Sequence, residues 1–271
     1  MPFKDLFDPN DEDYFFANKI LPGRPLHFIH IPKTAGSSLR EELRERLRPY
    51  ANLALDYSVK AVRLPLQMPH VVSQFLRDWE TRKIICSAGH IPYMHICRYA
   101  CVCPSVRFFT FLRNPLDRCV SDYCYQWTSA HPQRDEFVQE FPNFDLFLQS
   151  ERHQNRLYRH LNAYPYESVN SIIERLERSF LFVGTVEDYD LGFRVLTAAI
   201  GKETSPRKFV NRRHATEAPV VEPTAEQIET FNELNTSDIQ LYKLVSERWA
   251  KNRGLIQRKL ESVRETEAKW P

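Results

Sequence analysis

The chain has 271 residues, of which 42% are hydrophobic and 27% are charged. Its 37 lysines and arginines nearly balance its 35 aspartates and glutamates, so the formal net charge is +2. These values argue against a disordered chain, a collagen and a strongly basic nucleic-acid binder. A chain of this length can bury enough surface to fold as one large domain without disulfides or metal ions.

Hydropathy and the N-terminal residues indicate in which cellular compartment the protein is expected. No stretch of about 18 apolar residues exists, so no membrane-spanning helix is predicted. Residues 1–18 contain five acidic residues and lack the basic-then-apolar pattern of a signal peptide. We therefore expect a cytoplasmic protein, and a Golgi-lumen location only if an anchor has been removed from the chain.

Six cysteines lie between residues 86 and 124, and no C-x-x-C pair occurs among them. Cys97, Cys101 and Cys103 lie near His95, but their spacing matches no common structural zinc pattern. Disulfides would need an oxidising compartment, for which the sequence carries no targeting signal. We expect reduced thiols that serve in packing, and no metal ion.

Four short apolar runs are predicted as strands. They are Leu26–Ile31, Lys83–Ser87, Val106–Leu112 and Phe180–Gly184. The spacing of apolar residues predicts helices between and after them. These helices cover residues 39–47, 115–127, 144–161, 168–178, 189–200, 224–235 and 237–252.

The first and second of these helices carry clear local signals. Leu39, Leu43 and Leu47 form one apolar stripe, and Ser37 or Ser38 is placed to cap the first turn. Pro115 suits the first turn of the second helix.

Strands that alternate with helices predict an α/β fold, with a central, mainly parallel sheet flanked by helices and a helical C-terminal part. We expect an acidic N-terminal arm over residues 1–25, a single domain over 26–252 and a charged tail over 253–271. In such a sheet, ligands bind beyond the carboxyl ends of the strands. The segments after Ile31, Ser87 and Leu112 are therefore the candidate sites.

The segment His30–Ser38 joins the first strand to the first helix. Successive backbone N–H groups and the positive end of the helix dipole favour an anion there. Lys33 adds a mobile charge, Thr34, Ser37 and Ser38 add hydroxyl donors, and Gly36 permits close approach of backbone to ligand. The Walker A pattern is absent, and the alternative interpretation is a capped turn with an exposed lysine.

The segment Arg113–Tyr123 directly follows the third strand. Arg113 can offer a forked, permanently charged set of donors to a phosphate. Ser121, about two helical turns later, can add a neutral hydrogen bond. The alternative is that Arg113 pairs with Asp117 and that Ser121 is a surface hydroxyl.

Together, these two segments resemble the 3′-phosphoadenosine 5′-phosphosulfate (PAPS)-dependent sulfotransferases. Pro32–Ser38 is similar to that family's 5′-phosphosulfate loop. Arg113-Asn114-Pro115, with Arg118, Ser121 and Tyr123, is similar to its 3′-phosphate motif. Within the family the chain resembles the carbohydrate branch, represented by heparan sulfate 2-O-sulfotransferase and bacterial relatives. Two later stretches, Phe182–Tyr189 and Asn235–Tyr242, are similar as well.

The resemblance implies a P-loop-NTPase-like sulfotransferase fold and in-line transfer of a sulfuryl group from PAPS to an acceptor hydroxyl, leaving PAP. It assigns Lys33 to the phosphosulfate, and Arg113 and Ser121 to the 3′-phosphate. The 5′-phosphate would be held by the backbone of Thr34, Ala35, Gly36, Ser37 and Ser38. No metal is expected.

A base must accept the proton of the acceptor hydroxyl, and His90 follows the second strand in Ser87–Tyr93. A neutral imidazole near pH 7 suits that role, and the resemblance implies that His90 is the base. The heparan sulfate relative has a second histidine two positions earlier, where this chain has Ala88. The alternatives are a structural loop histidine at this position and Glu41 as the base.

Two further segments have open roles. Gln154, Asn155 and Arg156 either line the acceptor side or lie on a helix surface. The basic loop Arg207–His214 could place Phe209 near adenine and Arg212 near a phosphate. It could also form a groove for an acidic acceptor, or remain a solvated basic loop.

Other functions remain open at this point. A nucleotide-dependent kinase would use the same α/β layout, and a non-catalytic protein could hold PAP or an anionic glycan. The expected acceptor is a carbohydrate hydroxyl, with a small metabolite or a lipid hydroxyl as alternatives. No nucleic-acid partner is expected, and the oligomeric state cannot be read from the sequence.

Overall fold

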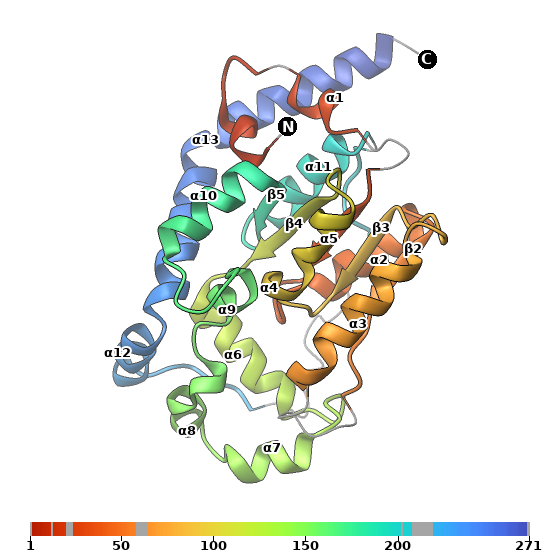
Figure 1. The fold of residues 1–271 in the computed structure, drawn as a ribbon. Coiled ribbons are helices and arrows are strands. Elements are labelled where there is room, and N and C mark those ends of the chain that lie inside the picture. Colours follow the sequence, from red (N-terminus) through yellow and green to blue (C-terminus); the bar gives the residue numbers. More distant parts are fainter. Residues whose placement is uncertain are drawn as a thin grey trace.

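A five-stranded sheet forms the centre of the molecule (Figure 1). The computed structural model describes residues 2–11, 13–19, 24–57, 64–201, 203–207 and 219–269. In spatial order the strands are β2 (Tyr50–Leu53), β3 (Cys86–Gly89), β1 (Leu26–Ile29), β4 (Arg107–Leu112) and β5 (Phe180–Thr185). Every neighbouring pair is parallel. The predicted α/β class with a parallel sheet is therefore confirmed.

The central position of β1 decides where the site lies. Leu26 of β1 is in register with Cys86 of β3 on one side and with Arg107 of β4 on the other. The chain leaves β1 toward one edge of the sheet and later crosses back to the other. Such a reversal of strand order opens a crevice at the carboxyl edge, and the three candidate segments all begin there.

Four of the five strands overlap the predicted runs, although β3 begins at Cys86, three residues later than predicted, and β2 was not predicted. Its four residues, Tyr-Ala-Asn-Leu, include alanine and asparagine, which are uncommon in strands. β2 is an edge strand that pairs only with β3 among the described strands. Pairing at the edge thus overrides a weak local preference.

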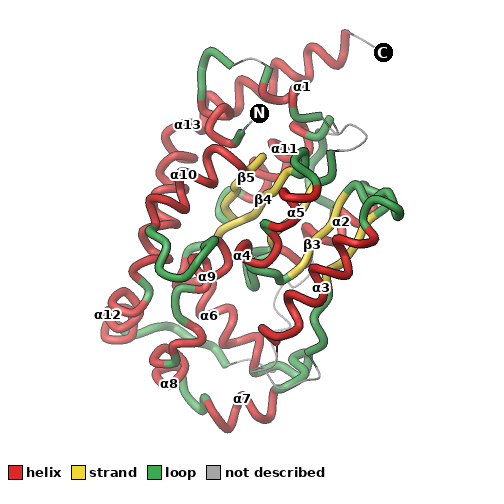
Figure 2. The backbone as a smooth tube through the Cα atoms, in the orientation of Figure 1, coloured by secondary structure: helices red, strands yellow, loops and turns green. Residues whose placement is uncertain are grey.

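Helices surround the strands (Figure 2). Those that follow the first three strands are α2 (Gly36–Arg46), α3 (Leu64–Asp78), α4 (Tyr93–Ile96), α5 (Arg98–Val102) and α6 (Pro115–Gln126). The later ones are α7 (Arg134–Glu140), α8 (Phe144–Gln149), α9 (Arg156–Leu161), α10 (Val169–Ser179), α11 (Tyr189–Ala199), α12 (Ala225–Leu234) and α13 (Thr236–Lys269). The sequence did not predict α3, α4, α5 or α7.

Two predicted helix features differ in the structure. The helix expected over 144–161 is divided into α8, a 3-10 turn at Glu151–His153 and α9. Ser150, which ends α8, is extended, and Asn155, which precedes α9, is left-handed (φ 47°). Neither serine caps α2, whose N-cap is Ala35. Pro115 does begin α6, and the Asn114 side chain caps it by accepting from two backbone N–H groups.

Both ends of the chain contribute to the main core. In the N-terminal segment, a 3-10 helix (Phe3–Phe7) and α1 (Tyr14–Ala17) bury Phe3, Leu6, Tyr14 and Phe15. The Tyr14 hydroxyl donates to the carbonyl of Leu181 in β5 (2.6 Å). α13 continues through Lys269 and buries Ile256, Leu260 and Val263. The boundaries at residues 25 and 252 stay predictions, but the side chains on both flanks share the core of the central region.

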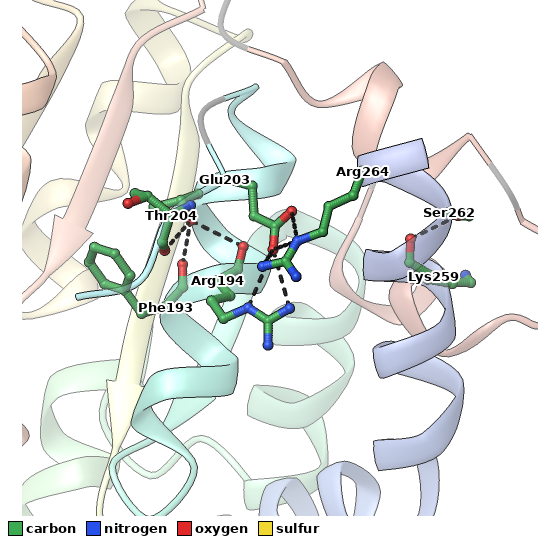
Figure 3. Close-up of polar contacts among 8 residues, drawn as sticks. Phe193, Arg194, Glu203, Thr204, Lys259, Ser262 and Arg264 are labelled. Carbon is green, nitrogen blue, oxygen red and sulfur yellow. Dashed lines mark hydrogen bonds and ion pairs between the residues drawn. The ribbon is translucent and has the colours of Figure 1, made fainter. Parts of the chain in front are cut away.

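Glu203 fastens α13 to α11 (Figure 3). Its carboxylate, 6% exposed, accepts from Arg194 of α11 (3.2 Å) and from Arg264 of α13 (2.8 Å). Next to it, the Thr204 N–H donates to Thr197 of α11 (3.1 Å). The backbone N–H of Arg207 then donates to Glu42, which is buried in α2. Residues 203–207 therefore tie α11, α13 and α2 together.

We expect Glu203→Ala to lower the free energy of unfolding by about 1–3 kcal/mol, because it removes the acceptor of two guanidinium groups. The matched control is Glu247→Ala, which removes an exposed partner of Lys243 (3.9 Å) and should cost no more than about 1 kcal/mol. Urea denaturation measures both. Equal losses in the two variants would show that Glu203 does not stabilise the contact between α11 and α13.

Candidate active site

Two of the candidate segments make hydrogen bonds to the loop that follows β1. The Nδ1–H of His90, just after β3, donates to the carbonyl of His30 (2.8 Å). Arg113, just after β4, donates from Nη1 to the carbonyl of Lys33 (3.3 Å). Lys33, His90 and Arg113 were singled out separately in the sequence, and the structure brings their segments together.

The loop after β1 has an unusual backbone. Lys33 (φ 69°) and Ala35 (φ 58°) are both left-handed, although neither is glycine. Between them, the buried Thr34 donates its hydroxyl to the carbonyl of Ile31 (2.9 Å). Left-handed residues in tight turns aim backbone N–H groups into anion-binding concavities, and strained backbone of this kind is concentrated at functional sites.

Gly36 serves a different purpose from the one expected. We expected it to let a ligand approach the backbone, but the His30 ring occupies the space beside it. A Cβ added to Gly36 would lie 1.8 Å from Cδ2 of His30, so no other residue fits without a rearrangement. Ser37 is half-buried and Ser38 is buried in the first turn of α2. The glycine thus sets the position of the His30 ring.

His90 is a buried imidazole that is neutral near pH 7. Its ring lies 4.0 Å from that of His30, centroid to centroid. Burial lowers the pKa of His90 to about 4, and the charges of Arg40 and Arg156 act in the same direction. A carbonyl can only accept, so the bond to His30 places the proton on Nδ1 and leaves the lone pair on Nε2. This is the tautomer that can take a proton from an acceptor hydroxyl.

Lys33 is enclosed by α6. Its Nζ lies 3.9 Å from the ring centroid of Tyr125. Burial lowers the pKa of Lys33; Asp122 opposes that shift, and Arg113 adds to it. The alternative of a freely exposed lysine is not what the structure shows.

Asp122 is a buried carboxylate that the sequence analysis did not single out. It accepts from Nη1 of Arg118 (3.3 Å), which is itself 1% exposed. Burial alone would raise the pKa of Asp122, but Arg118 and Arg156 outweigh it and lower that pKa. The only signal in the sequence is the i, i+4 spacing of Arg118 and Asp122, which is common on helix surfaces.

The group as a whole is cationic. Four positive side chains lie around the loop and the buried carboxylate of Asp122. They are Lys33, Arg113, Arg118 and Arg156. Within the described residues, the Nε atoms of Arg118 and Arg156 are buried without a hydrogen-bond partner. This excess of positive charge, with unused donors, is suited to a polyanionic ligand.

Of the segment 154–156, only Arg156 takes part in this group. Gln154 donates to backbone carbonyls of residues 148 and 149. Asn155 accepts from the N–H groups that open α13, while Asp238 of α13 caps α9 in return. The charge of Arg156 acts on both His90 and Asp122. This reciprocal capping accounts for Asn155 and for Asp238, which lies in the stretch Asn235–Tyr242, without any ligand.

Glu187 supports the turn that carries Arg113. Its carboxylate accepts from the backbone N–H of Asn114 (2.8 Å). Ser121 lies half-buried on α6, two turns after that point. The stretch Phe182–Tyr189 was noted only as similar to a family, and the structure shows what its glutamate holds in place.

Two predicted residues fall outside this group. Glu41, the alternative base, lies on α2 and accepts from Arg44 (2.7 Å). Arg212 and the rest of 208–214 lie outside the described residues, so the role of the basic loop stays a prediction.

The structure also bears on metals, disulfides and membranes. All six cysteines are free thiols. In the described ranges, no three His, Cys, Asp or Glu side chains are grouped in a way that could hold a metal ion. None of the helices in the same ranges has the length and apolar character needed to cross a bilayer.

No model of a known protein family matches the sequence, and no curated protein matches it either. Among solved structures, the chain is similar to the crystal structure of a sulfotransferase from Alicyclobacillus acidocaldarius, with 17% sequence identity and a TM-score of 0.48. The alignment covers 82% of this chain and 96% of that chain. A similarity of this size carries no argument about chemistry, so the function has to come from the residues of the site.

Stability should fall in mild acid because several histidines are held neutral by burial. Burial lowers the pKa of His27 and of His153 to about 3, that of His90 to about 4, and those of His30 and His160 well below the usual value. On unfolding, each takes up a proton below about pH 6.5, so its contribution is present above that pH and is lost as the pH falls toward the folded pKa.

We expect the free energy of unfolding to fall between pH 6 and 4.5, by at most about 1.4 kcal/mol per pH unit for each histidine that stays neutral in the folded state. Urea denaturation at several pH values measures the slope. His153→Phe removes one titrating group and should therefore lower the slope by about 1.4 kcal/mol per pH unit. Phenylalanine should fit at this position, because the His153 ring already packs against Phe147 (4.1 Å). A pH-independent free energy over this range would contradict the assignment of neutral, buried histidines.

Proposed function

We propose that the protein is a cytoplasmic sulfotransferase that moves the sulfuryl group of PAPS to an acceptor hydroxyl, with His90 as the general base. One observation carries the proposal: the loop of Lys33 receives hydrogen bonds from both His90 and Arg113, from two other strand ends. The proposed base His90 and the proposed phosphate-binding Arg113 thereby contact the loop that carries Lys33.

The residues of the site fit PAPS. The left-handed loop with Thr34–Ser38 would hold the 5′-phosphate, and Lys33 would face the phosphosulfate. Arg113, just before α6, and Ser121, two turns into α6, would hold the 3′-phosphate. The carboxylates of Asp122 and Asp238 offset only part of the charge of the four neighbouring cations.

When bound, PAPS supplies a sulfuryl group on a phosphate leaving group. The chain's own contribution is position and charge. His90 Nε2 accepts the proton of the acceptor hydroxyl, while Lys33 neutralises negative charge on the phosphosulfate oxygens. The bond from Arg113 to the Lys33 carbonyl holds both motifs in one geometry, which lowers the entropic part of the barrier.

The proposed acceptor is a carbohydrate hydroxyl, on the strength of the sequence resemblance. Ala88, which replaces a second histidine of the heparan sulfate relative, is fully buried within β3. His90 is therefore the histidine that this segment offers to an acceptor. The half-exposed Tyr57 ring lies 6.5 Å from the His90 ring and would form one wall of the acceptor space.

The first experiment is calorimetric binding of PAP, ADP and AMP without metal ions. PAP should bind at least tenfold more tightly than ADP, because Arg113 and Ser121 address the 3′-phosphate. Arg113→Ala should weaken PAP binding by about 1.5–3 kcal/mol, whereas Arg77→Ala, on the exposed side of α3, should not change it. Equal affinity for PAP and ADP would overturn the cofactor assignment and favour the kinase.

His90→Ala should lower turnover by about 10²–10⁴-fold while PAP binding is retained. His70→Ala, an exposed histidine on α3, is the matched control. Because the base must be neutral, kcat/KM of the wild type should stay level from neutral pH toward pH 5 and be halved near the His90 pKa of about 4, wherever circular dichroism shows folded protein. Near-normal turnover of His90→Ala would remove His90 from this role and leave a nucleotide-binding protein or another base.

A further inference from the structure

The Lys33 ammonium lies against the aromatic ring of Tyr125. The two are far apart in sequence, yet Nζ lies 3.9 Å from the ring centroid, well within the range of a cation–π interaction. Tyr125 lies in the last turn of α6, three residues after Asp122. Residues at this spacing face the same side of a helix, so the ring and the carboxylate address the same ammonium.

The Tyr125 ring is itself held in place. It packs edge-on against the ring of His131 (5.7 Å), whereas the Tyr125 hydroxyl makes only a long contact with the carbonyl of Ala130 (3.5 Å). The side chain remains 36% exposed. A fixed aromatic face beside the site can therefore set where the lysine lies before any anion arrives.

The charges around Lys33 act on its ammonium in both directions. The titratable and charged groups that face it come from the end of β1, from α6 and from the segments on either side of α6. They are His30, Arg113, Arg118, Asp122, Cys124 and His131. The two arginines and burial disfavour the ammonium, and Asp122 favours it. A ring face adds negative potential without adding a net charge.

We propose that Tyr125 is a positioning residue that holds the Lys33 ammonium protonated and in place for the anionic group of the substrate. The choice of ligand rests on the proposed function, whereas the contact between Tyr125 and Lys33 does not. Tyrosine suits this task better than a second carboxylate, because a full negative charge would also repel the phosphates.

The test compares ring electronics at constant shape. Tyr125→Phe is made first, and fluorinated phenylalanines are then incorporated at the same position, so that the ring face becomes progressively less negative. Tyr125→Leu removes the face altogether, and Tyr164→Leu, at an exposed position (54%), is the matched control. The first readout is the pKa of Lys33, from competitive acylation over a pH series with peptide mass spectrometry. The second is the affinity for PAP by calorimetry.

We expect Tyr125→Phe and Tyr164→Leu to behave as the wild type. Tyr125→Leu and the most fluorinated ring should lower the pKa of Lys33 by about 0.5–1 pH unit. They should weaken PAP binding by about three- to tenfold. The effect should grow with the degree of fluorination.

An unchanged Lys33 pKa across the fluorinated series would overturn the proposal. If Tyr125→Leu fails to fold, the fluorinated rings still decide, because they keep the shape of phenylalanine. The two readouts also distinguish a failure of the positioning role of Tyr125 from a failure of the proposed function. A shifted Lys33 pKa in a protein that shows no preference for PAP would support the positioning role and contradict the sulfotransferase.

Discussion

The loop between β1 and α2 is shaped by hydrogen bonds from two other parts of the chain. His90 donates to the carbonyl of residue 30 and Arg113 to the carbonyl of residue 33. Both bonds depend on the strand order, because β1 lies between β3 and β4 and all three run parallel. If other strands separated β1 from β3 or β4 in the sheet, His90 and Arg113 would no longer reach the loop.

The backbone of the loop needs this outside support. A left-handed conformation costs a non-glycine residue about 1–2 kcal/mol, and both Lys33 and Ala35 adopt one. A hydrogen bond from a charged donor contributes about 1.5–3 kcal/mol, and a neutral one about 0.5–1.5. The bonds from Arg113 and from the Thr34 hydroxyl are therefore of the size needed to hold the strained turn. The arginine proposed for the 3′-phosphate also shapes the loop proposed for the 5′-phosphate.

The parts of this arrangement that the sequence predicted are those with a local signal. The strands before Lys33, His90 and Arg113 are short apolar runs, and the parallel arrangement follows from their alternation with helices. The roles of Asp122, Tyr125 and Glu187 depend on which elements pack together, and no spacing along the chain reports that. β2 and the break at Asn155 escaped prediction for the same reason, since an edge pairing and hydrogen bonds with Leu234 and Asn235 at the end of α12 outweigh the local preferences.

The cations of the site also act on His90, the proposed base. Arg156 and Arg40 lower the pKa of His90 in the same direction as burial, so they help to keep the imidazole unprotonated. Asp122 acts in the opposite direction on His90, and its own charge is offset by Arg118 and Arg156. A site that gathers positive charge for a polyanion thus favours a neutral histidine beside it. Binding of an anion would reverse part of this effect and raise the proton affinity of His90 as the acceptor hydroxyl loses its proton.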